Sequence, residues 1–526
     1  MKTAKSMYSC LLAALLMVLS SGGIAGAVDP SDTKLGGGAL ANVANGVDDT
    51  ALGFNALNAD TDGSRNTATG SGAMQNNTTG NDNTANGFQS LQFNTTGVSN
   101  TAIGWQALNG NDTRHDNTAI GLAALQSNTS GFFNTATGKN ALVFNSTGSN
   151  NTADGTKALE ANTTGFKNTA SGVQSLFSNT TGFGNTAAGF QSLFKNSTGI
   201  GNTATGVNAL LNNTTGNSNT ATGLSALLNN TTGSTNTAIG VSALLSNTAG
   251  NSNTATGLQA LFRNTTGSNN TASGRNAMLS NTTGNYNTAD GVGALYNNTT
   301  GLQNTAVGTS ALFGNTTGNN NIGVGYNAAL NPTTGSNNIE VGNVGLAADT
   351  NTIRIGNQGT QTATYIAGIT NSSVMGVDVM INSAGRLGTV PSAARYKKDI
   401  SAMGDSTDGL MKLRPVTFRY KSDELGVKQY GLVAEEVDQV YPELVFHDAN
   451  GKVESVRYSM LTSMLLNELQ KETKENRRQA EQLQRQTQRN EQQAEKLARL
   501  EARLSKIEHV MAAKDGNRSL VAAFNQ

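Results

Sequence analysis

NTATGVNALLNNTTGNS, residues 202–218, is one copy of a seventeen-residue unit that fills more than half of this chain. The opening pattern of the unit, Asn/Asp-Thr-Ala-x-Gly, begins at Asp49 and returns every seventeen residues as far as Asn304. Degenerate copies begin at Asn321 and Asn338. A disordered segment has no reason to keep such a register over so many copies. The sequence therefore predicts a solenoid or a stacked roll.

The unit also predicts which of its side chains are buried. Its third residue is alanine, while its fourth varies, as in Thr69, Asn86 and Ile103, so alternation along a strand would turn alanine inward and the variable residue outward. The later Ala-Leu pair is expected to supply the larger apolar side chains of the core. The Asn-Thr-Thr-Gly segment contains residues that favour turns. We therefore expect two short strands and two turns per rung around a small core. With an imperfect first copy at Asp32, eighteen or nineteen rungs of roughly 4.8 Å give a rod of about 90 Å.

The repeat resembles the head repeats of trimeric autotransporter adhesins, with their short Asn-x-x-Ala-x-Gly rungs, and similar repeats of phage tail-fibre proteins. The resemblance covers roughly residues 32–345. It implies a left-handed parallel β-roll in which three chains pack side by side, and attachment to a host-surface or glycan receptor that the sequence does not identify. The unit is longer than the usual adhesin repeat. The end of the chain is polar and helical rather than barrel-forming, so a complete autotransporter is not expected.

Charge divides the chain into two unlike parts. Residues 1–391 hold 28 charged side chains, whereas the shorter segment 392–526 holds 42. Gly, Asn and Thr dominate the first part, a composition that cannot build an ordinary globular core. The net charge is zero and neither part is strongly basic, so nucleic acid is not an expected partner.

The N-terminus predicts export. Lys2 and Lys5 precede an apolar run from Leu11 to Leu19, and Ala25-Gly26-Ala27 resembles a small-residue cleavage site, so residues 1–27 are a predicted signal peptide. The nine apolar residues are too few to span a bilayer, and no later stretch is long and apolar enough for a transmembrane anchor. We expect the protein outside the cell or on its surface.

Neither a metal nor a cofactor is expected. Cys10, the only cysteine, lies inside the predicted signal peptide, so the mature chain would have no disulfide and no thiol site. His115, His447 and His509 are scattered without the spacing of metal ligands.

An ordered series of motifs follows the charge boundary. It consists of PSAARYKKDI (391–400), LRPVTFRYK (413–421), QYGLVAEEV (429–437), YPELV (441–445), VRY (456–458) and LLNELQ (465–470). This series resembles the endosialidase-type C-terminal intramolecular chaperones, the S-74 peptidases, over about 80 residues.

The resemblance implies a domain that trimerises, guides the folding of the fibre before it, and then cuts itself off immediately before the motif serine. By motif position Ser392 is the nucleophile, Lys397 the general base and Pro391–Ser392 the scissile bond. A serine hydroxyl needs such a base, and lysine serves when desolvation or a neighbouring cation lowers its pKa. Attack on the preceding carbonyl gives an ester by an N→O shift, which water then hydrolyses. Ala393 stands where family members often carry Asp or Ser, and Pro391 is a stiff acyl group.

The adjacent Glu435 and Glu436 could suggest an acid–base pair. Neighbours in a helix point in different directions, so packing or ion pairing is the favoured interpretation.

Between and beyond these motifs the chain divides further. Residues 346–391 are a predicted β-rich neck with strands at 352–355, 365–369, 377–381 and 387–390. The α+β chaperone and peptidase domain is assigned to 392–470, a trimeric coiled coil to 471–511 and a polar tail to 512–526. The coiled coil has a weak polar seam up to residue 495 and then an apolar one, formed by Leu497, Leu500, Leu504, Ile507 and Met511.

The sequence thus predicts an exported homotrimeric adhesin-like fibre, released by a single self-cleavage and without activity on free substrates. Two alternatives stay open. One is a fibre that does not cleave and keeps the same domain as a permanent trimerisation cap, and the other is a phage-derived tail fibre.

Overall fold

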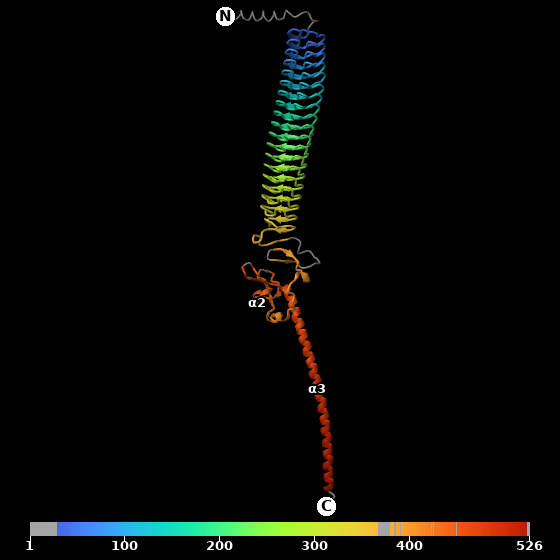
Figure 1. Ribbon diagram of the computed structural model, residues 1–526, viewed down its shortest axis with the longest axis vertical. Helices are drawn as coiled ribbons and strands as arrows, with labels where there is room; N and C mark the ends of the chain where they lie inside the picture. The colour runs from blue at the N-terminus through green and yellow to red at the C-terminus, as the bar shows by residue number, and fades with distance from the viewer. Residues whose placement is uncertain are drawn as a thin grey trace. The chain divides into compact units, whose positions relative to one another are not determined.

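The computed structural model describes residues 29–366, 379–382, 385–389, 391–421, 423, 425–448 and 450–522, with side chains to residue 514 in the last helix. The predicted signal peptide, residues 1–27, lies outside the described residues, and so does most of the predicted strand 365–369. The chain forms two compact units, Met1–Val374 and Met375–Gln526, which Figure 1 draws together and which are described separately below.

The first unit is a parallel β-solenoid with one three-residue strand per rung, drawn from blue to yellow in Figure 1. Each strand pairs in parallel with the next one along the chain, so that Thr203 lies opposite Thr220, seventeen residues on. The strands are Thr33–Leu35 (β1), Thr50–Leu52 (β2), Thr67–Thr69 (β3), Thr84–Asn86 (β4), Thr101–Ile103 (β5), Thr118–Ile120 (β6), Thr135–Thr137 (β7), Thr152–Asp154 (β8), Thr169–Ser171 (β9), Thr186–Ala188 (β10), Thr203–Thr205 (β11), Thr220–Thr222 (β12), Thr237–Ile239 (β13), Thr254–Thr256 (β14), Thr271–Ser273 (β15), Thr288–Asp290 (β16), Thr305–Val307 (β17), Ile322–Val324 (β18), Ile339–Val341 (β19) and Ile353–Ile355 (β20). The predicted solenoid is confirmed. The segment 352–355, predicted to belong to the neck, pairs with β19 and continues the same sheet.

The prediction of two strands per rung is wrong, because the Ala-Leu half of the unit is not extended. In the rung of β11, Asn208 and Leu210 have φ values of 58° and 51°, which interrupt any strand. The half-rung still bonds to its neighbour, since the Leu210 N–H donates to the Ala226 carbonyl at 2.9 Å. A left-handed leucine is an uncommon conformation. Complete burial of its side chain in every regular rung offsets the strain.

The core of the solenoid is the one that alternation predicts. Ala204, Ala209 and Leu210 have no exposed surface, and their equivalents form a continuous column through the stack. The variable fourth residue, such as Thr205, is exposed.

Two columns of buried asparagines run beside this core. In the first column, the Asn219 side-chain oxygen accepts hydrogen bonds from the backbone N–H and the Nδ2 of Asn236, at 3.0 and 3.1 Å. The Asn219 Nδ2 in turn donates to the Gly233 carbonyl at 2.8 Å. In the second column, the Asn213 Nδ2 donates to Asn196 Oδ1 at 2.7 Å and to the Gly216 carbonyl at 3.0 Å. These amides have no exposed surface, so their polar groups are satisfied by each other and by the turn backbone inside the protein.

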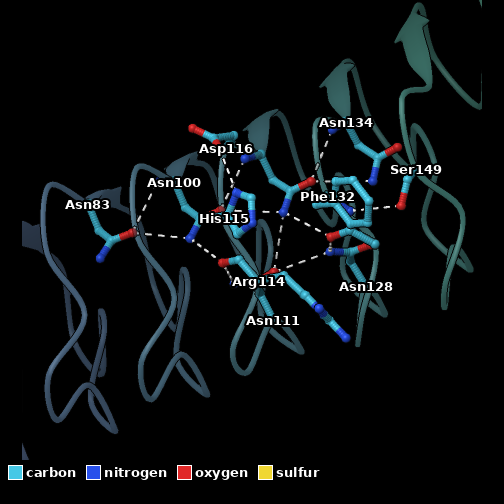
Figure 2. Close-up of polar contacts among 12 residues, drawn as sticks. Asn83, Asn100, Asn111, Arg114, His115, Asp116, Asn128, Phe132, Asn134 and Ser149 are labelled. Atoms are coloured by element: carbon cyan, nitrogen blue, oxygen red, sulfur yellow. Dashed lines mark hydrogen bonds and ion pairs between the residues drawn. The ribbon is translucent and has the colours of Figure 1, made fainter.

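Figure 2 shows both columns near the rung whose turn carries Arg114. Arg114 stands where the other turns carry glycine, yet its carbonyl still accepts from the Nδ2 atoms of Asn100 and Asn111, at 2.8 and 3.1 Å. The asparagine columns therefore depend on the backbone carbonyl at this position and not on the identity of its side chain. The hydrogen bonding of this rung differs in one place. The Asp112 N–H does not donate to the Thr129 carbonyl, although the corresponding bond is present in the neighbouring rungs.

Both columns begin with carboxylates. The first column starts at Asp32, whose Oδ1 accepts from the Asp49 N–H at 2.8 Å, and continues with Asp49, whereas the second starts at Asp60. Asp49 Oδ1 accepts from the Asn66 N–H, and Asp60 Oδ1 accepts from Asn77 Nδ2, both at 2.7 Å. A carboxylate can only accept, which suits the first member of a column whose donors all point toward the N-terminus. The Oδ2 atoms of Asp49 and Asp60 are buried and receive no hydrogen bond from any other residue. The Asp49 and Asp60 carboxyl groups hydrogen-bond to each other when Asp60 is protonated. Burial, and then the negative charge of Asp49, raise the pKa of Asp60 to about 8, and burial also raises the pKa of Asp49.

The C-terminal end of the solenoid also holds a buried acid. Glu340 occupies the strand position that alanine fills in the regular rungs, and both of its carboxyl oxygens are buried without a hydrogen-bond partner. Burial first, and then the nearby Asp349, raise the pKa of Glu340 to about 7. Asp349 is itself held by two hydrogen bonds from Arg354, both 2.7 Å long.

The second unit contains short strands, single turns of helix and one long helix. Its elements are Met380–Ile381 (β21), Leu387–Gly388 (β22), Ala394–Tyr396 (η2), Gly404–Thr407 (η3), Leu410–Lys412 (η4), Val416–Phe418 (β23), Gln429–Gly431 (β24), Ala434–Val440 (α2), Pro442–Leu444 (η5), Val445–His447 (β25), Val453–Val456 (β26) and Tyr458–Ala522 (α3). Antiparallel hairpins join β21 to β22, β23 to β24 and β25 to β26. The strands of the first hairpin lie within the predicted strands 377–381 and 387–390.

A small apolar core holds this unit together. It contains Leu410, Val437, Tyr441, Leu444, Val445, Leu461 and Met464, so α2 and the start of α3 pack on the same cluster. The predicted fold class is therefore confirmed for the single chain: a solenoid, an α+β unit and a long terminal helix. Among the described residues, no helix combines the length and the apolar character needed to cross a bilayer.

The amide columns give a first prediction. Asn219→Ala should lower the free energy of unfolding by about 1–3 kcal/mol for each buried partner that it leaves unsatisfied. Thr215→Ala, an exposed change in the same rung, should stay within about 0.5 kcal/mol of the parent chain. Chemical denaturation followed by circular dichroism measures both. Equal effects of the two changes would show that the column does not stabilise the solenoid.

The first rungs should be less stable in alkali. A pKa raised from 3.8 to about 8 means that folded Asp60 holds a proton that the unfolded chain releases. Its contribution to stability is therefore complete in acid and is lost as the pH rises through about 8. Asp60→Asn supplies a permanent donor to Asp49 and should remove most of this dependence. Thermal unfolding of both chains between about pH 6 and pH 9 checks this; parallel pH profiles would contradict it.

Candidate processing site

Ser392 and Lys397, predicted from motif position, lie together in the structure. The single turn η2 is closed by the Lys397 N–H donating to the Ala394 carbonyl at 3.0 Å, which brings residue 397 back toward residue 392. Lys397 Nζ lies 3.3 Å from Ser392 Oγ, within hydrogen-bond distance. Pro391 precedes this turn in an irregular segment, so the predicted scissile bond is not protected by a strand or a helix.

The pair is open to solvent in the single chain. All residues from Pro391 to Ile400 are exposed. The nearby Arg395 guanidinium lies 4.8 Å from the centre of the Tyr396 ring, an arrangement typical of a cation–π contact. A lysine acts as a general base where water is excluded or another cation lies close. The geometry of a Ser–Lys pair is present here, whereas the desolvated environment would have to come from other protein surface.

A polar network centred on the buried Thr407 connects the start of α3 to η3. Thr407 has no exposed surface and its hydroxyl donates to the Glu468 carboxylate. Asn467 Nδ2 donates to the Gly404 carbonyl at 2.9 Å. Lys471 contacts the carboxylates of Asp408 and Glu468, and these two acceptors raise the pKa of Lys471 above its ordinary value.

Sequence reasoning missed this network. Asn467 and Glu468 belong to the quoted LLNELQ motif, but their partners in η3 are about sixty residues away in the sequence. Glu436, in contrast, behaves as predicted. It forms an ion pair with Arg414, with nitrogen–oxygen distances of 3.2 and 2.5 Å, and this contact lowers the pKa of Glu436. Its neighbour Glu435 is exposed.

The described residues offer few other candidate sites. No group of three or more His, Cys, Asp or Glu side chains among them could hold a metal ion. An open groove of about 490 Å³ follows the flank of the solenoid and is lined by Lys195, Asn212, Thr214, Asn229, Thr231, Ser246 and Thr248. It lies in the first unit and contains no pair of groups suited to bond cleavage.

Comparison with known proteins identifies the segment that contains the pair. Residues 392–446 match the family model described as the chaperone of endosialidase. The match begins at Ser392, includes the hairpin of β23 and β24 together with α2, and confirms the resemblance inferred from the motifs. No curated protein and no solved structure matches the chain significantly.

The network around Thr407 gives a prediction for the chaperone unit. Thr407→Val keeps the shape of the side chain but removes the donor to Glu468, which should cost about 1–3 kcal/mol of stability. Ser401→Ala, an exposed change in the preceding segment, is the matched control. Denaturant unfolding of the full chain, monitored by proteolysis between residues 392 and 470, separates the two. A Thr407→Val chain as resistant as the control would contradict the stabilising role of the network.

Proposed function

We propose that this chain is an exported homotrimeric fibre, adhesin-like in its solenoid, whose C-terminal unit assembles the fibre and then cuts the Pro391–Ser392 bond. The family match at residues 392–446, placed directly after a long solenoid, supports a fibre of the tail-fibre or endosialidase kind. The observation that carries the cleavage step is the 3.3 Å approach of Lys397 Nζ to Ser392 Oγ. Export is supported by the sequence of residues 1–27 alone.

Exposed apolar side chains support the association of several copies. The sixth residue of the repeat unit forms a stripe along the solenoid, in which the following large side chains are exposed: Phe54, Phe88, Trp105, Leu122, Val173, Phe190, Val207, Leu224, Val241, Leu258, Val292 and Tyr326. Polar or charged residues interrupt the stripe at Ser71, Lys139, Thr156, Arg275 and Thr309. Twelve exposed large apolar side chains on one line are still unusual for a surface that remains in water. In the second unit, Leu483, Leu497 and Leu504 of α3 are each more than half exposed. Packing copies against each other would cover both surfaces.

Association would also complete the processing site. Ser392 and Lys397 are exposed in one chain, and covering them with a second copy would remove the water that keeps a lysine ammonium stable. The Lys397 amine then accepts the hydroxyl proton while Ser392 Oγ attacks the Pro391 carbonyl carbon. The C–N bond breaks as the proton passes to the Ser392 amine, which leaves an ester that water hydrolyses. Cleavage would thus follow assembly and act once per chain.

The exposed pair equally supports a second candidate. If no copy covers Ser392 and Lys397, the unit assembles the fibre and remains attached as a permanent cap. The groove on the flank of the solenoid would then, as in the first candidate, be the surface that meets a host-surface or glycan receptor.

Denaturing gels decide between the two candidates. Residues 392–526 are 135 of the 526 residues of a 54.2 kDa chain, so cleavage should release a fragment of about 14 kDa. Ser392→Ala and Lys397→Met should each abolish that fragment, whereas Ser401→Ala should leave it unchanged. A parent chain that yields no fragment supports the permanent cap, and cleavage in Ser392→Ala would rule out the assigned nucleophile. Crosslinking that finds only single chains would contradict both candidates.

A further inference from the structure

The helix α3 lacks a packing partner over most of its length. It spans 65 residues, and every side chain from residue 472 to residue 514 is exposed. A helix this polar and this long draws most of its stability from packing against other protein. The side chains along it identify both the partner and its alignment.

Counting in sevens from Leu469 gives one heptad register without interruption. The a positions are Leu469, Asn476, Leu483, Asn490, Leu497, Leu504 and Met511. The d positions are Glu472, Gln479, Gln486, Gln493, Leu500 and Ile507. The seam is thus apolar at its C-terminal end and polar in the middle, where leucine at 483 separates two asparagines. The apolar a and d positions from Leu497 to Met511 are the pattern of a coiled coil, and the mostly polar positions before them continue the same register.

The charges beside the seam match a second copy of the same helix in parallel. Lys496 and Arg503 are at g positions, and Glu501 and Glu508 are at e positions. In a parallel pair, a g residue faces the e residue five positions further along the other helix, which places Lys496 opposite Glu501 and Arg503 opposite Glu508. An antiparallel pair would place g against g and e against e, and so bring like charges together.

These four charges also form no ion pair with any residue that the structure describes. Elsewhere on α3, Arg478 pairs with Glu475 at 3.6 Å and Arg485 with Glu481 at 3.5 Å. The charges of the last two heptads make no such ion pair among the described residues. They are therefore available to a neighbouring helix.

The two asparagines supply the register. A shift of one heptad between two copies would place Asn476 opposite Leu483, and Leu483 opposite Asn490. Both asparagines would then lose a polar partner in the seam, a cost that is avoided when each faces its own copy. Asn490 already accepts a hydrogen bond from Gln486 at 3.1 Å, which orients its amide within the polar middle of the seam. The solenoid contributes little register information, because a whole-rung shift brings nearly identical surfaces together.

We propose that α3 is the surface on which copies of this chain align in parallel, and that Asn476 and Asn490 fix the register of that alignment. The inference rests on the homo-oligomer proposed above and adds its orientation and its register-determining residues. Lys496–Glu501 and Arg503–Glu508 contacts between copies set the orientation.

A single engineered thiol tests the alignment in the full chain, with Cys10→Ser removing the native cysteine. Leu483→Cys places a thiol in the seam, and Gln488→Cys places one at the outward f position of the same heptad. Oxidation should link Leu483→Cys chains at least about tenfold faster, because Cα atoms more than about 7 Å apart cannot be bridged. An oligomer without this product would overturn the aligned register alone. A chain that sediments as a monomer would instead overturn the proposed homo-oligomer.

The role of the asparagines is tested in the Leu483→Cys chain. Adding Asn476→Leu and Asn490→Leu should raise the melting temperature of the oligomer and lower the disulfide yield, because shifted registers become populated. Gln488→Leu with Glu495→Leu, the same number of changes at outward positions, should leave the yield unchanged. An unreduced yield in the asparagine variant would overturn their assignment.

Charge exchange tests the orientation. Lys496→Glu with Arg503→Glu should weaken association, as measured by sedimentation, because it faces glutamate with glutamate in parallel copies. Adding Glu501→Lys and Glu508→Lys should restore it. A fourfold variant that associates no better than the double variant would overturn the parallel arrangement.

Discussion

The hydrogen bonds between buried asparagines of successive rungs are the interaction on which the solenoid depends. A seventeen-residue rung is too short to enclose a large apolar core, and most of its length is turn rather than strand. The turn backbone must therefore find its hydrogen-bond partners inside the protein. Asn213 and Asn219 supply them by bonding to the rung on one side, to the rung on the other and to a glycine carbonyl. Alanine and leucine fill the small space that remains.

The same hydrogen-bonding requirement explains why acidic residues stand at the N-terminal end of the asparagine columns. A column of amides has a direction, since each member accepts from the following rung, and the first member needs no donor of its own. Asp32 and Asp60 occupy those first positions, and burial followed by the charge of Asp49 raises the pKa of Asp60 to about 8, so that Asp60 retains its proton at neutral pH. At the other end, Glu340 replaces alanine and closes the core with an acid whose pKa burial has raised to about 7. Both ends of the rod are thus sensitive to pH while its interior carries no charge column.

Much of the solenoid fold could be predicted from the sequence, because the spacing of the repeated motif gives the length of one rung. The fixed spacing from Asp49 to Asn338 predicted the rung, and alternation predicted the burial of Ala204 and the exposure of Thr205. The left-handed leucine at positions such as Leu210 could not be predicted, since leucine has no preference for that conformation and only its neighbours hold it there. Ser392 and Lys397 were found by motif because they lie close in sequence. The contact of Thr407 with Glu468 joins residues far apart in the chain and leaves no local pattern.

The two asparagine columns continue through the irregular turn at Arg114. They do so because the asparagines bond to the backbone carbonyl of this residue and not to its side chain. Regular rungs go further, since each makes the same bonds to the rung before and the rung after. Removing or duplicating a whole unit would rejoin two surfaces that already fit. The length of such a rod is therefore almost free to change by steps of one repeat in its gene, without a compensating change elsewhere in the protein.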